Sequence, residues 1–132
     1  MLWSRAENIC SFPGCNRDLI VDATKDDKAS FIGVECHIVA SSDDWARGLN
    51  RISEEENAKY RQLIDDKDGY INLILLCPNH HKVIDDQPNT YTIEAVCTMK
   101  REHELKVRAS LSTADEAKRR DQDVYASITA QW

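Results

Sequence analysis

Two pairs of metal-binding side chains, far apart along the chain, constrain its fold more than any other feature. Cys77 and His80 have the Cys-x-x-His spacing of a zinc knuckle, and the segment CSFPGC offers a second sulfur pair, Cys10 and Cys15, across a turn. Four such ligands make a closed tetrahedral site. We therefore expect the N-terminal turn to meet the segment that follows the apolar stretch before Cys77.

The cysteine count favours a metal over disulfides. The chain has five cysteines, an odd number, and thiolates in a reducing cytosol serve better as metal ligands. We expect Cys10, Cys15, Cys77 and His80 to bind a structural zinc ion. The alternative is that these cysteines are buried thiols. Cys97, in an apolar helical stretch, is expected to be a small buried hydrophobe.

A second candidate metal pair follows the knuckle. His81 and Asp85 are four residues apart, so in a helix that begins at Pro78 both side chains project from one face and can hold one cation with open positions. Upstream, the extended, β-branched stretch 31–39 presents His37. The alternatives are a core histidine at position 37 and a solvated carboxylate at position 85.

The order His37, Asn72, His81, with the phrases CHIVA and NLILLCPNHHKVIDD, resembles the HNH nuclease family over residues 10–86. The resemblance implies an α+β fold: a ββα-metal finger with a structural zinc knuckle and flanking helices. It also implies roles for single residues. His37, held by a neighbouring carbonyl, would be the general base, Asn72 the residue that braces the finger, and His81 a ligand of the catalytic metal, with Asp85 as a further ligand.

One position departs from the pattern of the family. Many HNH proteins carry Asp or His immediately before the base as an additional metal ligand, whereas this chain has Cys36 there. Alternation along a strand places Glu35 and His37 on one face and Cys36 on the other, unless a bulge intervenes. We therefore expect Glu35 to be the third protein ligand of the catalytic cation and Cys36 to be a buried thiol.

The flanking segments LWSRAENICSFPGCNR and DDQPNTYTIEAVCTMKREHE are similar to HNH effector nucleases of bacterial anti-phage defence. Those are often fused to a SAVED sensor domain in cyclic-oligonucleotide (CBASS) systems, which implies a fused or associated sensor domain here. The family implies hydrolysis of DNA phosphodiester bonds with Mg²⁺ or Mn²⁺, and histidine ligation also admits Zn²⁺ or Ni²⁺. The alternative function is a zinc-containing module that binds nucleic acid or protein without cleavage.

The charge of the chain limits how it can bind DNA. A formal net charge of −6 argues against a nucleic-acid coat protein, because Lys and Arg supply most non-specific affinity for phosphates. Bound dications offset part of this charge, and we expect Arg47, Arg51 and Lys82 to form a local basic strip that binds substrate. The domain alone should bind DNA weakly, with further affinity from another domain, a partner subunit or a homo-oligomer.

The length and patterning predict one domain with an extension. A chain of 132 residues with 42% hydrophobic content supports one core, and the finger is so small that it needs a bound metal ion for stability. With no apolar run of membrane-spanning length and no secretory leader, we expect a cytoplasmic protein that does not enter membranes. We place the nuclease domain over residues 1–111 and a C-terminal helical extension or linker over residues 112–132.

Local signals give the expected elements. Ser53 and Glu56 have capping-box spacing, Thr92 is the expected cap of a later helix, and His103 is expected at the surface. A further capping-box spacing begins at Thr113. We expect helices over 2–8, after Ser53, after Pro78 and from Thr92 to about Leu111, strands over 31–39 and 70–76, a connector over 22–30 and a substrate-facing loop over 40–51.

Overall fold

The computed structural model describes the backbone of residues 1–129 and the side chains of residues 1–111. The chain is mixed helix and sheet, with two small antiparallel sheets that pair β1 with β2 and β3 with β4. Its elements are α1 (Leu2–Arg5), β1 (Ile20–Val21), β2 (Ser30–Phe31), β3 (Val34–His37), η1 (Leu49–Arg51), α2 (Glu54–Lys59), α3 (Arg61–Asp65), η2 (Tyr70–Asn72), β4 (Leu73–Leu76), α4 (Pro78–Asp86) and α5 (Ile93–Thr129).

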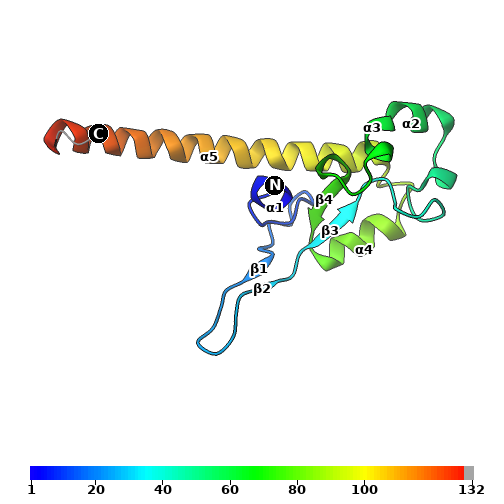
Figure 1. Cartoon of the computed structure of the whole chain (residues 1–132), viewed down its shortest axis with the longest axis horizontal. Helices are drawn as coiled ribbons and strands as arrows, with labels where there is room; N and C mark the ends of the chain where they lie inside the picture. The colour runs from blue at the N-terminus through cyan, green and yellow to red at the C-terminus, as the bar shows by residue number, and fades with distance from the viewer. Residues whose placement is uncertain (130–132) are drawn as a thin grey trace.

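Strand β4 is the centre of the core. Helices α1, α4 and α5 all contact it, and Figure 1 shows α5 and α4 on opposite sides of the β3–β4 pair. Ile74, Leu75 and Leu76 are fully buried, as expected for an unbroken apolar run covered on both faces. The register pairs His37 with Leu73 and Val34 with Leu76, so His37 lies at the end of β3 where β4 begins.

The expected strand over 31–39 is wrong as a single element. Ser30–Phe31 pairs with β1 in a hairpin that projects from the body (Figure 1), and β3 begins only at Val34. The expected connector over 22–30 forms the whole loop of this hairpin and the first residue of β2. The break falls near Gly33, where a Cβ atom would lie 2.7 Å from the Trp3 ring, so the chain can pass under that ring only without a side chain.

The second strand is shorter than expected at its start. Residues 70–72 form the 3₁₀ turn η2, in which the Asn72 N–H donates to the Gly69 carbonyl at 3.0 Å. Because this backbone group bonds within the turn, it is not available to a sheet ladder. Strand pairing therefore begins at Leu73.

Several helix signals are confirmed. The capping box of Ser53 and Glu56 is present at the start of α2, and α4 begins at Pro78 with Cys77 as its N-cap. The Thr92 hydroxyl accepts a hydrogen bond from the Ala95 N–H at 3.2 Å at the start of α5. The expected N-terminal helix ends early, at Arg5, because the chain turns through positive φ angles at Glu7 and Asn8.

Helix α5 is longer than expected. It continues to Thr129 instead of ending near Leu111, so Thr113 lies inside it and does not begin a new helix. No glycine or proline interrupts the sequence after Pro88, which removes the usual stop signals. The C-terminal part of α5 extends beyond the other elements (Figure 1), and it makes most of the expected extension over 112–132 helical.

The inner part of α5 is fixed to α1. His103 is half-buried, and its Nε2–H donates to the Ala6 carbonyl at 2.9 Å, so the expectation of a surface histidine is wrong. The charged neighbours of His103 in the sequence indicated a solvent-exposed helix face. The contact with Ala6 depends on the packing of α1 against α5. Across residues 1–129, no helix is sufficiently long and apolar to span a membrane.

Candidate functional site

The two ligand pairs expected from the sequence converge. The ligand atoms of Cys10, Cys15, Cys77 and His80 all lie within 4.8 Å of one another. His80 Nδ1 is 3.2 Å from Cys77 Sγ and 3.7 Å from Cys10 Sγ. These four residues can hold a metal ion. Among the residues whose side chains the structure describes, no other group of three or more ligand side chains is arranged in this way.

The N-terminal turn forms half of this cluster by docking on β4. The Ser11 N–H donates to the Leu75 carbonyl at 2.9 Å, and the Cys77 N–H donates to Cys10 Sγ at 3.2 Å. Phe12 stacks on the His80 ring, with ring centroids 4.0 Å apart and an interplanar angle of 1°. Backbone hydrogen bonds and ring packing therefore fix the ligands from two distant parts of the chain.

The surroundings of Cys10 and Cys77 shift the pKa values of the two thiols in opposite directions. Burial raises the pKa of Cys10 to about 12. Burial also acts against ionisation of Cys77, but the His80 N–H and the neighbouring Cys10 and Cys15 side chains outweigh it and lower the pKa of Cys77. Cys77 is the N-cap of α4, and the N-terminus of a helix favours the thiolate form of a cysteine. These surroundings favour the thiolate form of Cys77, which is the form that binds a metal.

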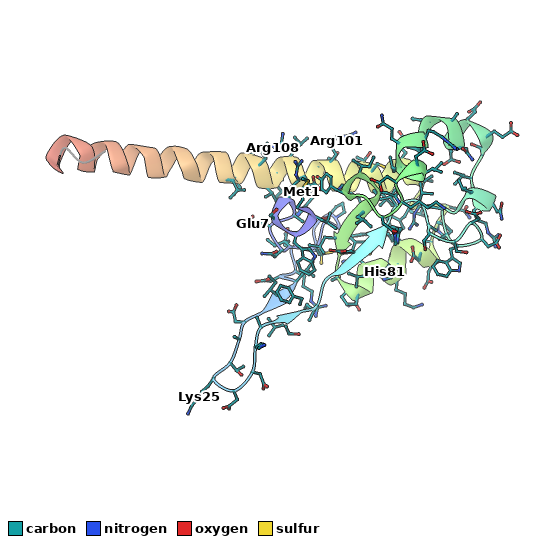
Figure 2. The ribbon with its side chains drawn as sticks, in the orientation of Figure 1. Met1, Glu7, Lys25, His81, Arg101 and Arg108 are labelled. Atoms are coloured by element: carbon teal, nitrogen blue, oxygen red, sulfur yellow. The ribbon has the colours of Figure 1, made fainter. Side chains whose placement is uncertain are left out.

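A cavity of about 270 Å³ lies at the end of β3, beside α4. His37, His81 and Asp85 line it, and the loop expected to face substrate contributes Ala40, Ser41, Trp45 and Ala46. His81 Nε2 is 3.1 Å from Asp85 Oδ2. Figure 2 shows His81 on α4, on the side of the molecule away from α5. The structure thus brings the two candidate catalytic histidines to one cavity.

The partner of His37 is a residue that the sequence analysis missed. His37 Nε2 lies 2.8 Å from Asp68 Oδ1, where a backbone carbonyl was expected. A carboxylate only accepts, so in the neutral ring Nε2 carries the proton and Nδ1 remains free to accept one. Asp68 directly precedes Gly69, and an Asp-Gly pair by itself indicates only a turn.

Asn72 ties together the segments that carry His37 and Asp68. It is fully buried, and its Oδ1 accepts from the Val39 N–H at 2.8 Å. Its Nδ2 donates to the Val39 carbonyl at 3.0 Å and to the Lys67 carbonyl at 2.8 Å. Val39 lies two residues after His37, and Lys67 immediately precedes Asp68. One amide side chain therefore fixes the spacing between the two segments.

We expect Asn72→Ala to lower the free energy of unfolding by about 3 kcal/mol, because the two buried backbone groups of Val39 and the half-buried carbonyl of Lys67 lose their partner. Urea denaturation of the purified protein measures this loss. Asn79→Ala is the matched control, since Asn79 is exposed on α4, and it should change stability by less than about 0.5 kcal/mol. Equal stability of the two variants would contradict the bracing role.

The expected basic strip does not form at the surface. Arg47 is buried, and its guanidinium donates to Asp85 Oδ1 at 2.7 Å. Arg51 donates to the Asp44 carbonyl at 3.0 Å, and the exposed Lys82 pairs with Asp86 at 2.8 Å. Arg47 faces the interior because the protein's own acceptors surround it, which its position in a polar loop did not indicate.

Glu35 is not brought to the cavity. The strand alternation is as expected, since Cys36 is buried while Glu35 and His37 face outward. However, Glu35 accepts a hydrogen bond from the Trp3 indole at 3.0 Å and does not line the cavity with His81. Burial raises the pKa of Cys36, which favours the neutral thiol.

Comparison of the sequence with protein-family models and with curated proteins found no match. A functional assignment therefore depends on the residues and the geometry described above.

Proposed function

We propose that this chain is a metal-dependent HNH endonuclease that hydrolyses DNA phosphodiester bonds. The observation that supports this most directly is the cavity shared by His37, His81 and Asp85. The antiparallel pair β3–β4 followed by α4 supports the proposed ββα-metal finger. A module that only binds needs neither a histidine with a free ring nitrogen, such as His37, nor a second pair of metal ligands beside it, such as His81 and Asp85. The non-catalytic alternative therefore explains less of this geometry.

In this proposal the cluster of Cys10, Cys15, Cys77 and His80 binds structural zinc. With bonds of about 2.3 Å to sulfur and 2.0–2.1 Å to nitrogen, neighbouring ligands of tetrahedral zinc lie about 3.6 Å apart. The observed separations of 3.2 and 3.7 Å between His80 Nδ1 and two sulfurs fit this value. Protein ligands fill all four positions, which suits a structural ion and leaves none for a substrate.

His81 and Asp85 fit a second, harder cation. Neighbouring ligands of an octahedral ion with bonds of about 2.1 Å lie about 3.0 Å apart, and His81 Nε2 is 3.1 Å from Asp85 Oδ2. The cation is Mg²⁺ or Mn²⁺, with Zn²⁺ or Ni²⁺ as the other ions that imidazole accepts. When bound, such an ion stabilises the charge that develops on the phosphate oxygens.

The protein's own residues supply the proton transfer and the orientation. His37 Nδ1 accepts a proton from a water molecule, while Asp68 holds the opposite side of the ring through Nε2–H. The water oxygen bonds to phosphorus as the bond to the 3′ oxygen breaks, and the departing 3′ oxygen takes a proton from solvent, which leaves 5′-phosphate and 3′-hydroxyl ends. Trp45, which is 64% exposed at the cavity, offers a stacking surface for a base.

The biological setting follows from the flanking sequences. Because the flanking segments resemble them, we propose that the chain belongs to the cytoplasmic effector nucleases of bacterial anti-phage defence, which act with a fused or associated sensor domain. The net charge of −6 supports a partner or homo-oligomer that supplies DNA affinity. Arg101 and Arg108 project from the side of α5 that faces away from α4 (Figure 2), so they do not contribute positive charge near His81.

A plasmid assay tests this function. Purified protein with Mg²⁺ or Mn²⁺ should convert supercoiled DNA to nicked or linear forms, and EDTA should stop the conversion. If the purified chain does not cleave DNA, forced dimerisation should activate cleavage. DNA binding without cleavage under all of these conditions would instead support the binding module.

We expect Asp68→Ala to reduce kcat between about 10- and 100-fold, because the His37 ring loses its orientation. DNA affinity should stay unchanged. Asp66→Ala removes a neighbouring exposed carboxylate that does not contact His37, and it should cleave at the wild-type rate. Single-turnover rates and DNA-binding isotherms of the two variants measure this, and wild-type kcat in Asp68→Ala would exclude the orienting role.

A further inference from the structure

Arg47 is a buried cation in an unusual backbone conformation. Its side chain is 3% exposed, and its φ angle is +61°, which is uncommon for any residue with a side chain. A buried guanidinium is tolerated only where acceptors surround it. Such a conformation outside glycine often marks a functional position, because the surrounding structure must enforce it.

The contacts of Arg47 connect the two elements that form the histidine-lined cavity. Nε donates to the Ile38 carbonyl at 2.8 Å, and Nη1 donates to the Ile84 carbonyl at 2.7 Å. Ile38 directly follows His37, and Ile84 directly precedes Asp85. One planar group therefore sets the distance between the end of β3 and the last turn of α4.

Arg47 and His81 contact different oxygens of the Asp85 carboxylate. Nη2 donates to Asp85 Oδ1 at 2.7 Å, while Asp85 Oδ2 lies 3.1 Å from His81 Nε2. With Oδ1 occupied by the guanidinium, only Oδ2 can turn toward a cation beside His81. Charge-assisted hydrogen bonds of this kind are strong and directional.

We propose that Arg47 is a positioning residue that restricts Asp85 to cation binding through Oδ2 alone, and that holds this oxygen at a fixed distance from His37. This inference rests on the proposed nuclease function and deepens it. Lysine cannot replace Arg47, since its ammonium is a point charge without the planar fork that reaches Ile38, Ile84 and Asp85 together.

The test is Mn²⁺ binding by the full chain, measured by electron paramagnetic resonance of the free ion, with no need for cleavage. Arg47→Lys should weaken Mn²⁺ binding about 10- to 100-fold, as expected when a group that orients a metal ligand is lost. Arg61→Lys is the matched control, because Arg61 forms an exposed pair with Asp65 at 3.3 Å, and it should bind Mn²⁺ like the wild type.

A second background separates positioning from a general loss of structure. In Asp85→Ala, adding Arg47→Lys should weaken Mn²⁺ binding no further. An equal loss in both backgrounds, or wild-type Mn²⁺ affinity in Arg47→Lys, would overturn the inference and leave the proposed function intact. No Mn²⁺ binding by the wild type at His81 and Asp85 would overturn both.

Should Arg47→Lys fail to fold, the wild-type protein still decides the question. A crystal structure of the Mn²⁺-loaded chain should show Asp85 bound through Oδ2, with Oδ1 on Arg47. Coordination by both carboxylate oxygens would overturn the inference.

Discussion

Cys77→Ala is expected to leave the chain largely unfolded at 25 °C. Binding of structural zinc contributes about 10–16 kcal/mol in small zinc domains, which matches or exceeds the whole stability of a typical domain, about 5–15 kcal/mol. Cys77 Sγ is one of the four ligand atoms of the cluster and lies 3.2 Å from His80 Nδ1, so its removal leaves the metal with three protein ligands. Circular dichroism melts and zinc content per chain measure the effect.

Cys97→Ala is the matched control for this variant. Cys97 is half-buried on α5, outside the metal cluster, and its truncation should lower the free energy of unfolding by about 1 kcal/mol without loss of zinc. If Cys77→Ala melts at the wild-type temperature with a full zinc content, the structural metal is wrongly assigned.

His37→Ala is expected to reduce DNA cleavage about 10²- to 10⁴-fold, the usual contribution of a general base. The fold should remain intact, because His37 is 31% exposed and its partner Asp68 is 92% exposed, so little buried contact is lost. DNA affinity should also be retained. Initial rates of plasmid nicking, together with a thermal melt, measure both parts of the prediction.

His103→Ala provides the comparison for His37. His103 is also half-buried, but it lies on α5 and bonds to Ala6, away from the cavity. This variant should melt at a lower temperature and cleave at the wild-type rate. Wild-type cleavage by His37→Ala, or equal rate losses in the two variants, would remove His37 from the mechanism.

The features that were predictable from the sequence are those fixed by short spacing. Cys-x-x-His at residues 77–80 and the four-residue spacing of His81 and Asp85 each depend on one turn of helix. The meeting of Cys10 and Cys15 with Cys77 and His80 was also predictable, because either pair of ligands alone fills only two of the four positions of a tetrahedral metal. Helix starts at Ser53, Pro78 and Thr92 follow from local capping chemistry.

The features that were not predictable depend on contacts between segments. Arg47 is buried because it donates hydrogen bonds to the carbonyls of Ile38 and Ile84. The direction of a backbone carbonyl cannot be predicted from a sequence pattern. Asp68 meets His37 where the buried Asn72 side chain holds their two segments together. Glu35 fails to reach the cavity because Trp3 binds its carboxylate, a contact made by the fold of the N-terminus.

The most direct test of the account is a crystal structure of the chain with Mn²⁺ and a DNA oligonucleotide that carries a non-cleavable linkage. The proposed mechanism predicts an anomalous peak for Mn²⁺ between His81 and Asp85, with the scissile phosphate between that ion and His37 Nδ1. A phosphate bound elsewhere, or Mn²⁺ bound away from His81, would contradict the claim that the two histidines act on one phosphodiester bond.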